Sequence, residues 1–255
     1  MRRLAGDRAK TALAVDCIEP GFFSLTDREE QMKLVNSVVD KAISEGIYVL
    51  IDWHDHNAEQ HLEESKAFFA IMAQKYAGVP NVIYEIFNEP ARQRWEVVKS
   101  YSSEVIKVIR HYDPDNIIVV GSPRWDQDVD VAASDPIKGF KNLVYSFHFY
   151  ASDPNHQEKL RAKAELAMER GLPLFVTEWG VGESNGNGEF NLEKTDVWLQ
   201  WMEKNRLSWA TWHVTDKNET TALMLPGAPS NGGWKIGQLS PNGRYIREKL
   251  RLLNK

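Results

Sequence analysis

The feature that most constrains the fold of this chain is a regular alternation of short apolar runs with longer amphipathic segments. The short runs are rich in Val, Ile and Tyr, which is typical of strands that are buried on both faces of a parallel sheet. The longer segments carry apolar residues at helical spacing. Repeated strand–helix units of this kind predict a parallel sheet covered by helices, and therefore an α/β protein.

The expected elements can be read from the sequence. The predicted strands are a weak one at Ala12–Asp16 and stronger ones at Tyr48–His54, Asn81–Asn88, Asn116–Gly121, Leu143–His148, Leu174–Glu178 and Ser208–His213. The predicted helices are Asp27–Ser44, Glu63–Tyr76, Trp95–His111, Asn155–Arg170, Leu192–Asn205 and Asn242–Leu253. The sequence has no repeat of fixed period, no low-complexity segment and no linker, so we expect residues 1–255 to form a single domain.

Polar or charged residues end four of the apolar runs, at His54, at Asn88 with Glu89, at His148 and at Glu178. In a parallel barrel, the active site is built from residues at the C-terminal ends of the strands. Side chains placed at the end of one strand after another would therefore meet at one opening.

The composition excludes several classes of function. The 31 basic and 36 acidic residues give a net charge of −5 without long runs of either sign, so we expect no nucleic-acid or anionic membrane surface. A single cysteine, Cys17, excludes an intrachain disulfide and a cysteine metal cluster. No apolar run approaches the roughly 18 residues of a membrane span, and the residues after Met1 do not resemble a signal peptide.

The chain contains nine tryptophans, which is more than a core of this size usually needs. An indole ring can lie flat against the apolar face of a sugar, although core packing is the more common role of any single tryptophan. The excess therefore favours a carbohydrate-binding protein.

Two glutamates stand in matching contexts. Glu89 in Asn88-Glu89-Pro90 and Glu178 in Thr177-Glu178-Trp179 each lie at the end of a predicted buried strand. Hydrolysis of a glycosidic bond needs one carboxyl group that donates a proton to the leaving oxygen and one carboxylate that attacks the anomeric carbon. One such glutamate is more often a helix cap or a surface charge, but two in the same context favour catalysis.

Six segments, in the same order and spacing, resemble the family 5 glycoside hydrolases of the bacterial endoglucanase type. They are Val49–His54, Asn81–Pro90, Ser146–Tyr150, Phe175–Gly180, Ser208–Trp212 and Ser230–Trp234. The resemblance implies a (β/α)8 TIM barrel that forms one catalytic domain. It also implies a secreted endo-β-1,4-glucanase, or cellulase, that acts on β-glucan or cello-oligosaccharides with retention and needs no cofactor or metal.

The resemblance also implies roles for single residues. Glu89 would be the acid/base, Glu178 the nucleophile, and Asn88 would bind the sugar 2-hydroxyl, although by itself it could be a turn residue. His148 and Tyr150 alternate on one strand, so they face the same side, where they would position the two carboxyl groups. Taken alone, His148 would more often be a core histidine.

Further sugar contacts are implied around these residues. They are His54 at the floor of the pocket, Trp212 as the platform next to the scissile bond, Lys217 with Glu219 as polar contacts to the next glucose, and Trp125 with Trp179 as rim platforms. Lys217 and Glu219 could equally be a solvated loop pair. We expect no metal at the His54-Asp55-His56 cluster, because it has no obvious third ligand.

The start of the chain departs from the family pattern. The family's first strand has no match, and Lys10 or Thr11 aligns where a second-strand arginine would brace the nucleophile. Lysine cannot form the bidentate contact of a guanidinium. We therefore expect an N-terminally truncated, partial barrel that begins near residues 12–16 and ends with the helix at 242–253. Its exposed strand edges predict a homo-oligomer, and a closed seven-stranded barrel is the alternative.

Other functions stay open from the sequence. A mannanase or a mixed-linkage glucanase would use the same scaffold with different contacts to the 2-hydroxyl. A sugar-binding protein with an impaired active site is an alternative from another class, although both glutamates are present. A nucleotide-binding barrel is disfavoured because no Gly-rich phosphate loop follows a strand.

Overall fold

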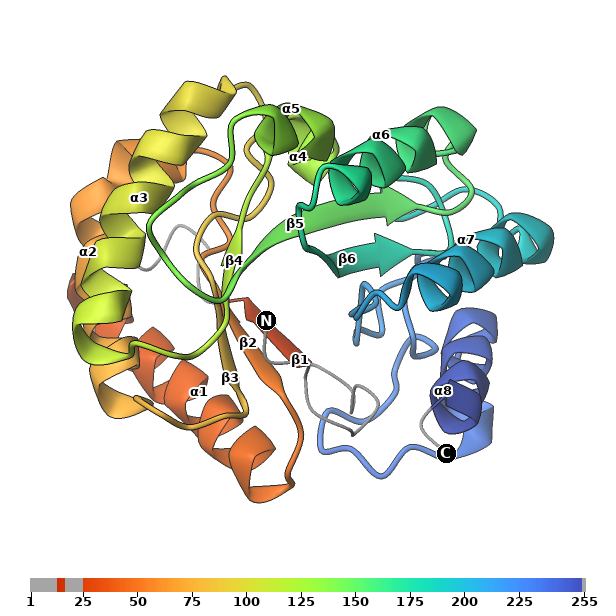
Figure 1. The fold of residues 1–255 in the computed structure, drawn as a ribbon. Helices are drawn as coiled ribbons and strands as arrows, with labels where there is room; N and C mark the ends of the chain where they lie inside the picture. Colours follow the sequence, from red (N-terminus) through yellow and green to blue (C-terminus); the bar gives the residue numbers. More distant parts are fainter. Residues whose placement is uncertain (1–12, 17–24, 254–255) are drawn as a thin grey trace. The chain divides into compact units, whose positions relative to one another are not determined.

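A computed structural model describes residues 13–16 and 25–253 of the chain (Figure 1). The chain packs as two compact units. The first runs as far as Phe147 and includes Ala162–Phe175, and the second contains His148–Arg161 and the chain from Val176 onward. The prediction of one catalytic domain stays a prediction. The expected Lys10 or Thr11 substitution lies outside the described residues.

The strands form a sheet in the order of the sequence, as a chain of strand–helix units predicts (Figure 1). They are β1 (Leu13–Asp16), β2 (Val49–Asp52), β3 (Val82–Glu85), β4 (Ile118–Val120), β5 (Leu143–Tyr150) and β6 (Leu174–Gly180). The pairs from β1 to β5 are all parallel. Every residue of β2, β3 and β4 is buried, and these strands are apolar except for Asp52 and Glu85, which end β2 and β3.

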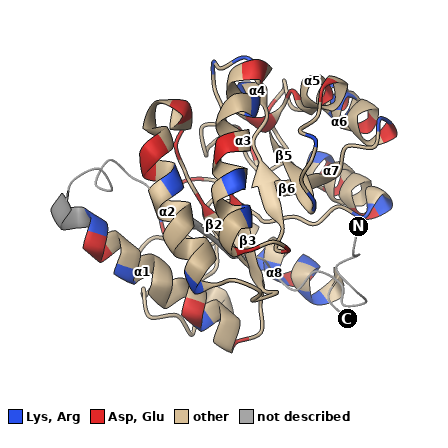
Figure 2. Ribbon diagram, turned by 60° about the vertical axis from the view of Figure 1, so that its left-hand side comes forward, with Lys and Arg blue, Asp and Glu red and all other residues tan. Residues whose placement is uncertain are grey.

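Helices follow the strands. They are α1 (Leu25–Ser44), α2 (Leu62–Lys75), α3 (Trp95–Tyr112), α4 (Pro123–Asp126), α5 (Val129–Ser134), α6 (Glu158–Glu169), α7 (Leu192–Asn205) and α8 (Pro241–Leu253), with short 3-10 turns η2 (Ala58–His61) and η3 (Ile236–Gln238). The sequence predicted the longer helices but not α4 and α5. Acidic and basic residues are interspersed along α1 and α2 (Figure 2). Among the described residues, no helix combines the length and apolarity that crossing a lipid bilayer requires.

The first unit is stabilised by an apolar cluster with one residue from each of four strands. Leu50, Ile83, Val119 and Phe175 are each at most 5% exposed and pack together. Such a layer of side chains from neighbouring strands fills the interior of parallel barrels. Truncation of one of these residues to alanine would cost about 2–5 kcal/mol of folding free energy.

The predicted strand at Ser208–His213 does not form as a regular strand. Only an isolated bridge between Val176 and Trp209 forms there. The N–H of Trp212 donates to the carbonyl of Trp179 at 2.7 Å, and the N–H of His213 donates to that of Thr221 at 3.3 Å. The backbone beyond the bridge is therefore bonded partly to β6 and partly to the loop at Thr221, and a pattern of alternating apolar residues does not distinguish this arrangement from a regular strand.

Candidate active site

Backbone hydrogen bonds join the segment after β2 to the segment after β3, which leads to Glu89. The N–H of Trp53 donates to the carbonyl of Glu85 at 2.9 Å, and the N–H of Asn88 donates to that of Trp53 at 3.1 Å. Beside them, Oδ2 of Asp52 accepts a hydrogen bond from Nδ1 of His54 at 2.9 Å. His54 and Asn88 therefore lie on two segments that are hydrogen-bonded to each other beyond the ends of β2 and β3.

Glu89 is fixed in the first unit through its backbone. Its φ of 51° lies in the left-handed region that residues other than glycine rarely adopt. Its N–H donates to Oδ2 of Asp126 at 3.0 Å, and its carbonyl oxygen accepts from Nδ1 of His56 at 3.0 Å. The same His56 nitrogen lies 3.9 Å from the Glu89 carboxyl group, and the Glu89 side chain is 16% exposed. Bonds on both sides of this residue set the direction of its carboxyl group.

Asn88 lies next to Glu89 and is buried, with 2% of its surface exposed. Its Nδ2 has no hydrogen-bond partner among the described residues. Buried amide donors are rarely left without a partner in folded proteins, so such an atom marks a position where a ligand oxygen can bind. The expected contact with a sugar hydroxyl stays a prediction.

An unusual turn after β4 supports Glu89. Arg124, Trp125 and Asp126, all in α4, have φ values of 57°, 56° and 57°. The N–H of Trp125 donates to the carbonyl of Pro90 at 3.1 Å, and the N–H of Asp126 donates to that of Ser122 at 3.1 Å. Each non-glycine residue in this region costs about 1–3 kcal/mol, so the contacts around the turn must impose it. Trp125 is 45% exposed on this turn, and its platform role stays a prediction.

The second unit contains Glu178, which is 7% exposed and lies within β6, a strand that continues past the predicted end to Gly180. The hydroxyl of Tyr150 donates to Oε1 of Glu178 at 2.6 Å. This length is typical of a hydroxyl bound to an ionised carboxylate. His148, two residues before Tyr150 on β5, hydrogen-bonds through Nε2 with Oγ1 of Thr177 at 2.9 Å. The sequence resemblance implied the contact between Tyr150 and Glu178 but not the one between His148 and Thr177.

The backbone of Tyr150 is also fixed by a hydrogen bond. Its N–H donates to Nδ1 of His156 at 2.9 Å, so this nitrogen carries no proton. Asp153 lies in the same turn before α6 and accepts from the N–H of Asn155 at 2.9 Å and from the hydroxyl of Ser184 at 2.8 Å. Burial opposes the charge on Asp153, but these hydrogen bonds outweigh it and hold the pKa of its carboxyl group below the usual value.

The expected rim position of Trp179 is wrong. Trp179 is 0% exposed, and its ring lies 5.7 Å from that of Phe149 and 5.6 Å from that of Trp209. Successive residues of a strand point to opposite faces, so Trp179 points away from the side that Glu178 faces. Trp179 is therefore a core residue. The next residue, Gly180, has no room for a side chain, because a Cβ atom there would lie 2.7 Å from the Tyr150 ring.

The loop after Trp209 carries the remaining expected sugar contacts. The Trp212 and His213 rings stack at 4.4 Å, and Nε2 of His213 donates to Oε1 of Glu219 at 2.5 Å. The hydroxyl of Thr221 donates to the same oxygen at 3.3 Å. Glu219 is therefore part of an ordered network, whereas Lys217 is exposed. Their roles in binding sugar stay predictions.

The histidines near the end of β2 contact protein groups. Nδ1 of His61 donates to Asp55 at 2.6 Å, while Nδ1 of His54 and of His56 contact Asp52 and the Glu89 carbonyl. Each ring therefore uses one nitrogen to position a neighbouring group. His56 is therefore part of the support of Glu89, whereas His54 and His61 bond to Asp52 and Asp55.

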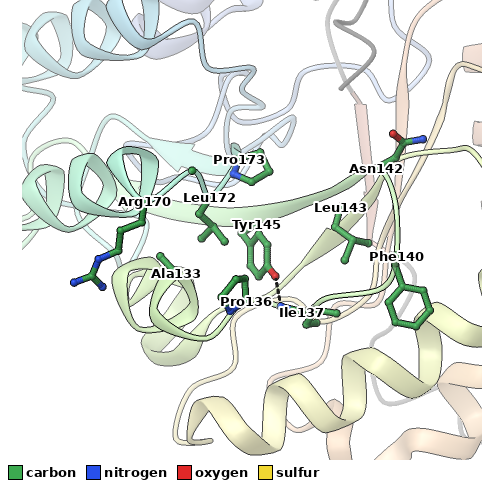
Figure 3. Close-up of a pocket in the computed structure, with 11 residues that line it drawn as sticks. Ala133, Pro136, Ile137, Phe140, Asn142, Leu143, Tyr145, Arg170, Leu172 and Pro173 are labelled. Carbon is green, nitrogen blue, oxygen red and sulfur yellow. Dashed lines mark hydrogen bonds between the residues drawn. The ribbon is translucent and has the colours of Figure 1, made fainter.

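A cavity of about 260 Å³ lies at the N-terminal ends of β5 and β6 (Figure 3). Tyr145 lies in its wall, and the N–H of Ile137 donates to the Tyr145 hydroxyl at 2.9 Å. Tyr150 stands at the other end of β5. Because active sites of parallel barrels lie at the C-terminal ends of the strands, this cavity is not the candidate active site.

Sequence reasoning missed three supporting residues. Asp126 and His56 bind the backbone of Glu89, and His156 binds the backbone of Tyr150. Asp126 follows an apolar run, as the predicted residues Glu89 and Glu178 do. The residues of the turn separate it from that run, so its position after a strand is not evident from the sequence. No sequence signal distinguishes His156 from an ordinary helix-cap residue. Glu89 lies in the first unit and Glu178 in the second, so the distance expected for a retaining pair stays a prediction.

Comparison with known protein families identifies the family of this chain. The model of the cellulase family, glycosyl hydrolase family 5, matches residues 18–218. The chain belongs to this family. Membership of this family confirms the predicted fold class, a (β/α)8 barrel. The six described strands form part of such a barrel.

Relatives with curated names agree with this assignment. Endoglucanase Z of Dickeya dadantii is 48% identical over 83% of this chain and 50% of its own length. Endoglucanase A of Evansella cellulosilytica is 44% identical over 85% of this chain and 45% of its own length. The chain thus spans about half the length of these curated relatives.

A solved structure is also similar. The catalytic domain of Thermobifida fusca endoglucanase Cel5A (E5) is 32% identical, with a TM-score of 0.87 over 94% of this chain and 81% of that domain. A variant of the same domain has been solved in complex with cellotetraose.

Proposed function

We propose that this chain hydrolyses internal bonds of β-1,4-glucan with retention of anomeric configuration, with Glu89 as the acid/base and Glu178 as the nucleophile. The observation that carries the proposal is the hydrogen bond of 2.6 Å from the Tyr150 hydroxyl to a largely buried Glu178. Hydrogen bonding to the charged form of a carboxyl group favours that form, and a nucleophile must be ionised.

The reaction follows from these roles. The Glu178 carboxylate attacks the anomeric carbon while the protonated Glu89 gives its proton to the leaving oxygen, so the glycosidic bond breaks and the first sugar product departs. Glu89, now a carboxylate, takes a proton from water. The resulting hydroxide displaces Glu178 from the anomeric carbon and restores both groups. No cofactor takes part in these steps.

The substrate proposal is a β-1,4-glucan because the relatives are named endoglucanases and a related domain binds cellotetraose. The exposed indole of Trp125 and the unpartnered amide of Asn88 offer a stacking surface and a donor for a sugar hydroxyl. A polymeric glucan is too large to enter a cell, so we place the reaction outside it. Self-association of the chain also stays a proposal, which light scattering at micromolar concentration tests.

The test is a substrate panel with release of reducing ends as the readout. We expect turnover of soluble cellulose and barley glucan and little turnover of mannan or xylan. The E178Q variant should lose turnover but keep binding to soluble cellulose, because the aromatic contacts are unchanged. A preference for mannan would replace the glucanase proposal by the mannanase alternative, and binding without turnover by the wild-type chain would indicate a sugar-binding protein.

A further inference from the structure

We propose that Asp126 is a positioning residue for the acid/base, because its carboxyl group locks the backbone of Glu89 onto the turn that carries Trp125. This inference rests on the proposed role of Glu89. In this role Asp126 does not contact the reacting atoms. It acts by fixing where the Glu89 carboxyl group stands.

The Asp126 carboxyl group joins the ends of two strands. Oδ2 accepts the N–H of Glu89 at 3.0 Å, and Oδ1 accepts the N–H of Ser122 at 2.5 Å. Glu89 follows β3, and Ser122 follows β4. Asp126 is 0% exposed, so water does not compete for these bonds. A buried carboxyl group that accepts from both segments holds them at a fixed separation.

A second hydrogen bond joins the same two segments. The N–H of Trp125 donates to the carbonyl of Pro90 at 3.1 Å, so the two residues after Asn88 are both bonded to consecutive residues of the turn. Glu89 and Asp126 both have left-handed φ values, which neither would adopt without these contacts. Because Trp125 is exposed on the same turn, the position of a sugar stacked on its ring is coupled to the position of the acid.

The consequence concerns proton donation. A misplacement of a catalytic group by about 1 Å can lower a rate about 100-fold. A displaced Glu89 harms the cleavage of bonds whose leaving group must be protonated, such as those of cello-oligosaccharides. It matters much less for a dinitrophenyl cellobioside, because the departing phenolate is stable without a proton. General loss of structure would slow both substrates alike.

The experiment compares D126N and D126A with the wild-type chain, using kcat/KM on cellopentaose and on the dinitrophenyl cellobioside. This ratio reports the glycosylation step, in which Glu89 acts as the acid. The asparagine side chain in D126N keeps one acceptor oxygen and the size of the aspartate that it replaces. We expect kcat/KM on cellopentaose to fall about 10-fold in D126N and about 100-fold in D126A, with at most about a threefold change on the activated substrate.

The matched control is D128N. Asp128 lies just beyond the same turn, and its carboxyl group binds Nζ of Lys163 at 2.5 Å. D128N should leave both substrates unaffected. Equal losses on both substrates in D126N and D126A, or no loss on either, would overturn the inference. If the wild-type chain hydrolyses neither substrate, the proposed function fails instead.

Discussion

Removal of the Tyr150 hydroxyl tests the part of the site that the structure defines most closely. In Y150F, the hydrogen bond of 2.6 Å to Glu178 is lost while the ring stays against Gly180. A hydrogen bond to a charged group contributes about 1.5–3 kcal/mol. Each 1.4 kcal/mol corresponds to about a tenfold change in rate, so we expect kcat/KM to fall roughly 10- to 100-fold.

The assay is steady-state hydrolysis of an aryl cellobioside, together with thermal unfolding. Y145F is a matched control, because Tyr145 lies on the same strand and its buried hydroxyl also has one hydrogen bond, to the N–H of Ile137. Y145F should lower the free energy of unfolding by about as much as Y150F does, but it should retain activity. The reasoning is refuted if Y150F retains wild-type kcat/KM, or if Y145F loses as much activity as Y150F.

Three further predictions follow from named contacts. In W125A, loss of stacking on a side chain that is 45% exposed should raise KM for cellopentaose about 3- to 10-fold with little change in unfolding temperature, and an unchanged KM would exclude a platform role. In G121A, the new Cβ would lie 2.3 Å from the Phe87 carbonyl oxygen, so calorimetry should show a loss of about 1–3 kcal/mol, whereas G237A, which has open space, should be neutral. Burial raises the pKa of Tyr145 to about 12, so the folded state binds this proton more tightly than the unfolded state. Denaturant titrations from pH 10 to pH 12 should therefore show wild-type stability falling more steeply than that of Y145F, by about 2 kcal/mol at pH 12, and parallel curves would contradict the assignment.

The order of the elements was predictable from the sequence because a buried parallel sheet leaves a plain signature. The strands β2, β3 and β4 formed within the predicted apolar runs, and every residue of these strands is buried. The weak run at Ala12–Asp16 also became a strand, β1 (Leu13–Asp16), paired with β2. The run at Ser208–His213 formed only an isolated bridge, because its backbone groups bond partly to β6, at Val176 and Trp179, and partly to the loop at Thr221.

The residues that support the candidate site were harder to predict. Strand alternation could have shown that Trp179 faces away from Glu178, since the two are adjacent on β6. The left-handed turn that ends at Asp126 could not have been predicted, because it contains no glycine and it is bonded to Pro90 and Glu89. Contacts of this kind depend on segments that are distant in the sequence.

Covalent trapping of the glycosyl-enzyme intermediate shows which residue is the nucleophile. A 2-deoxy-2-fluoro cellobioside with an activated leaving group forms the glycosyl-enzyme but slows its hydrolysis, so the modified residue can be found by peptide mass spectrometry. We expect one cellobiosyl adduct, on the peptide that contains Glu178, and none in E178Q. An adduct on Glu89, or the absence of any adduct on a chain that turns over cellopentaose, would contradict it.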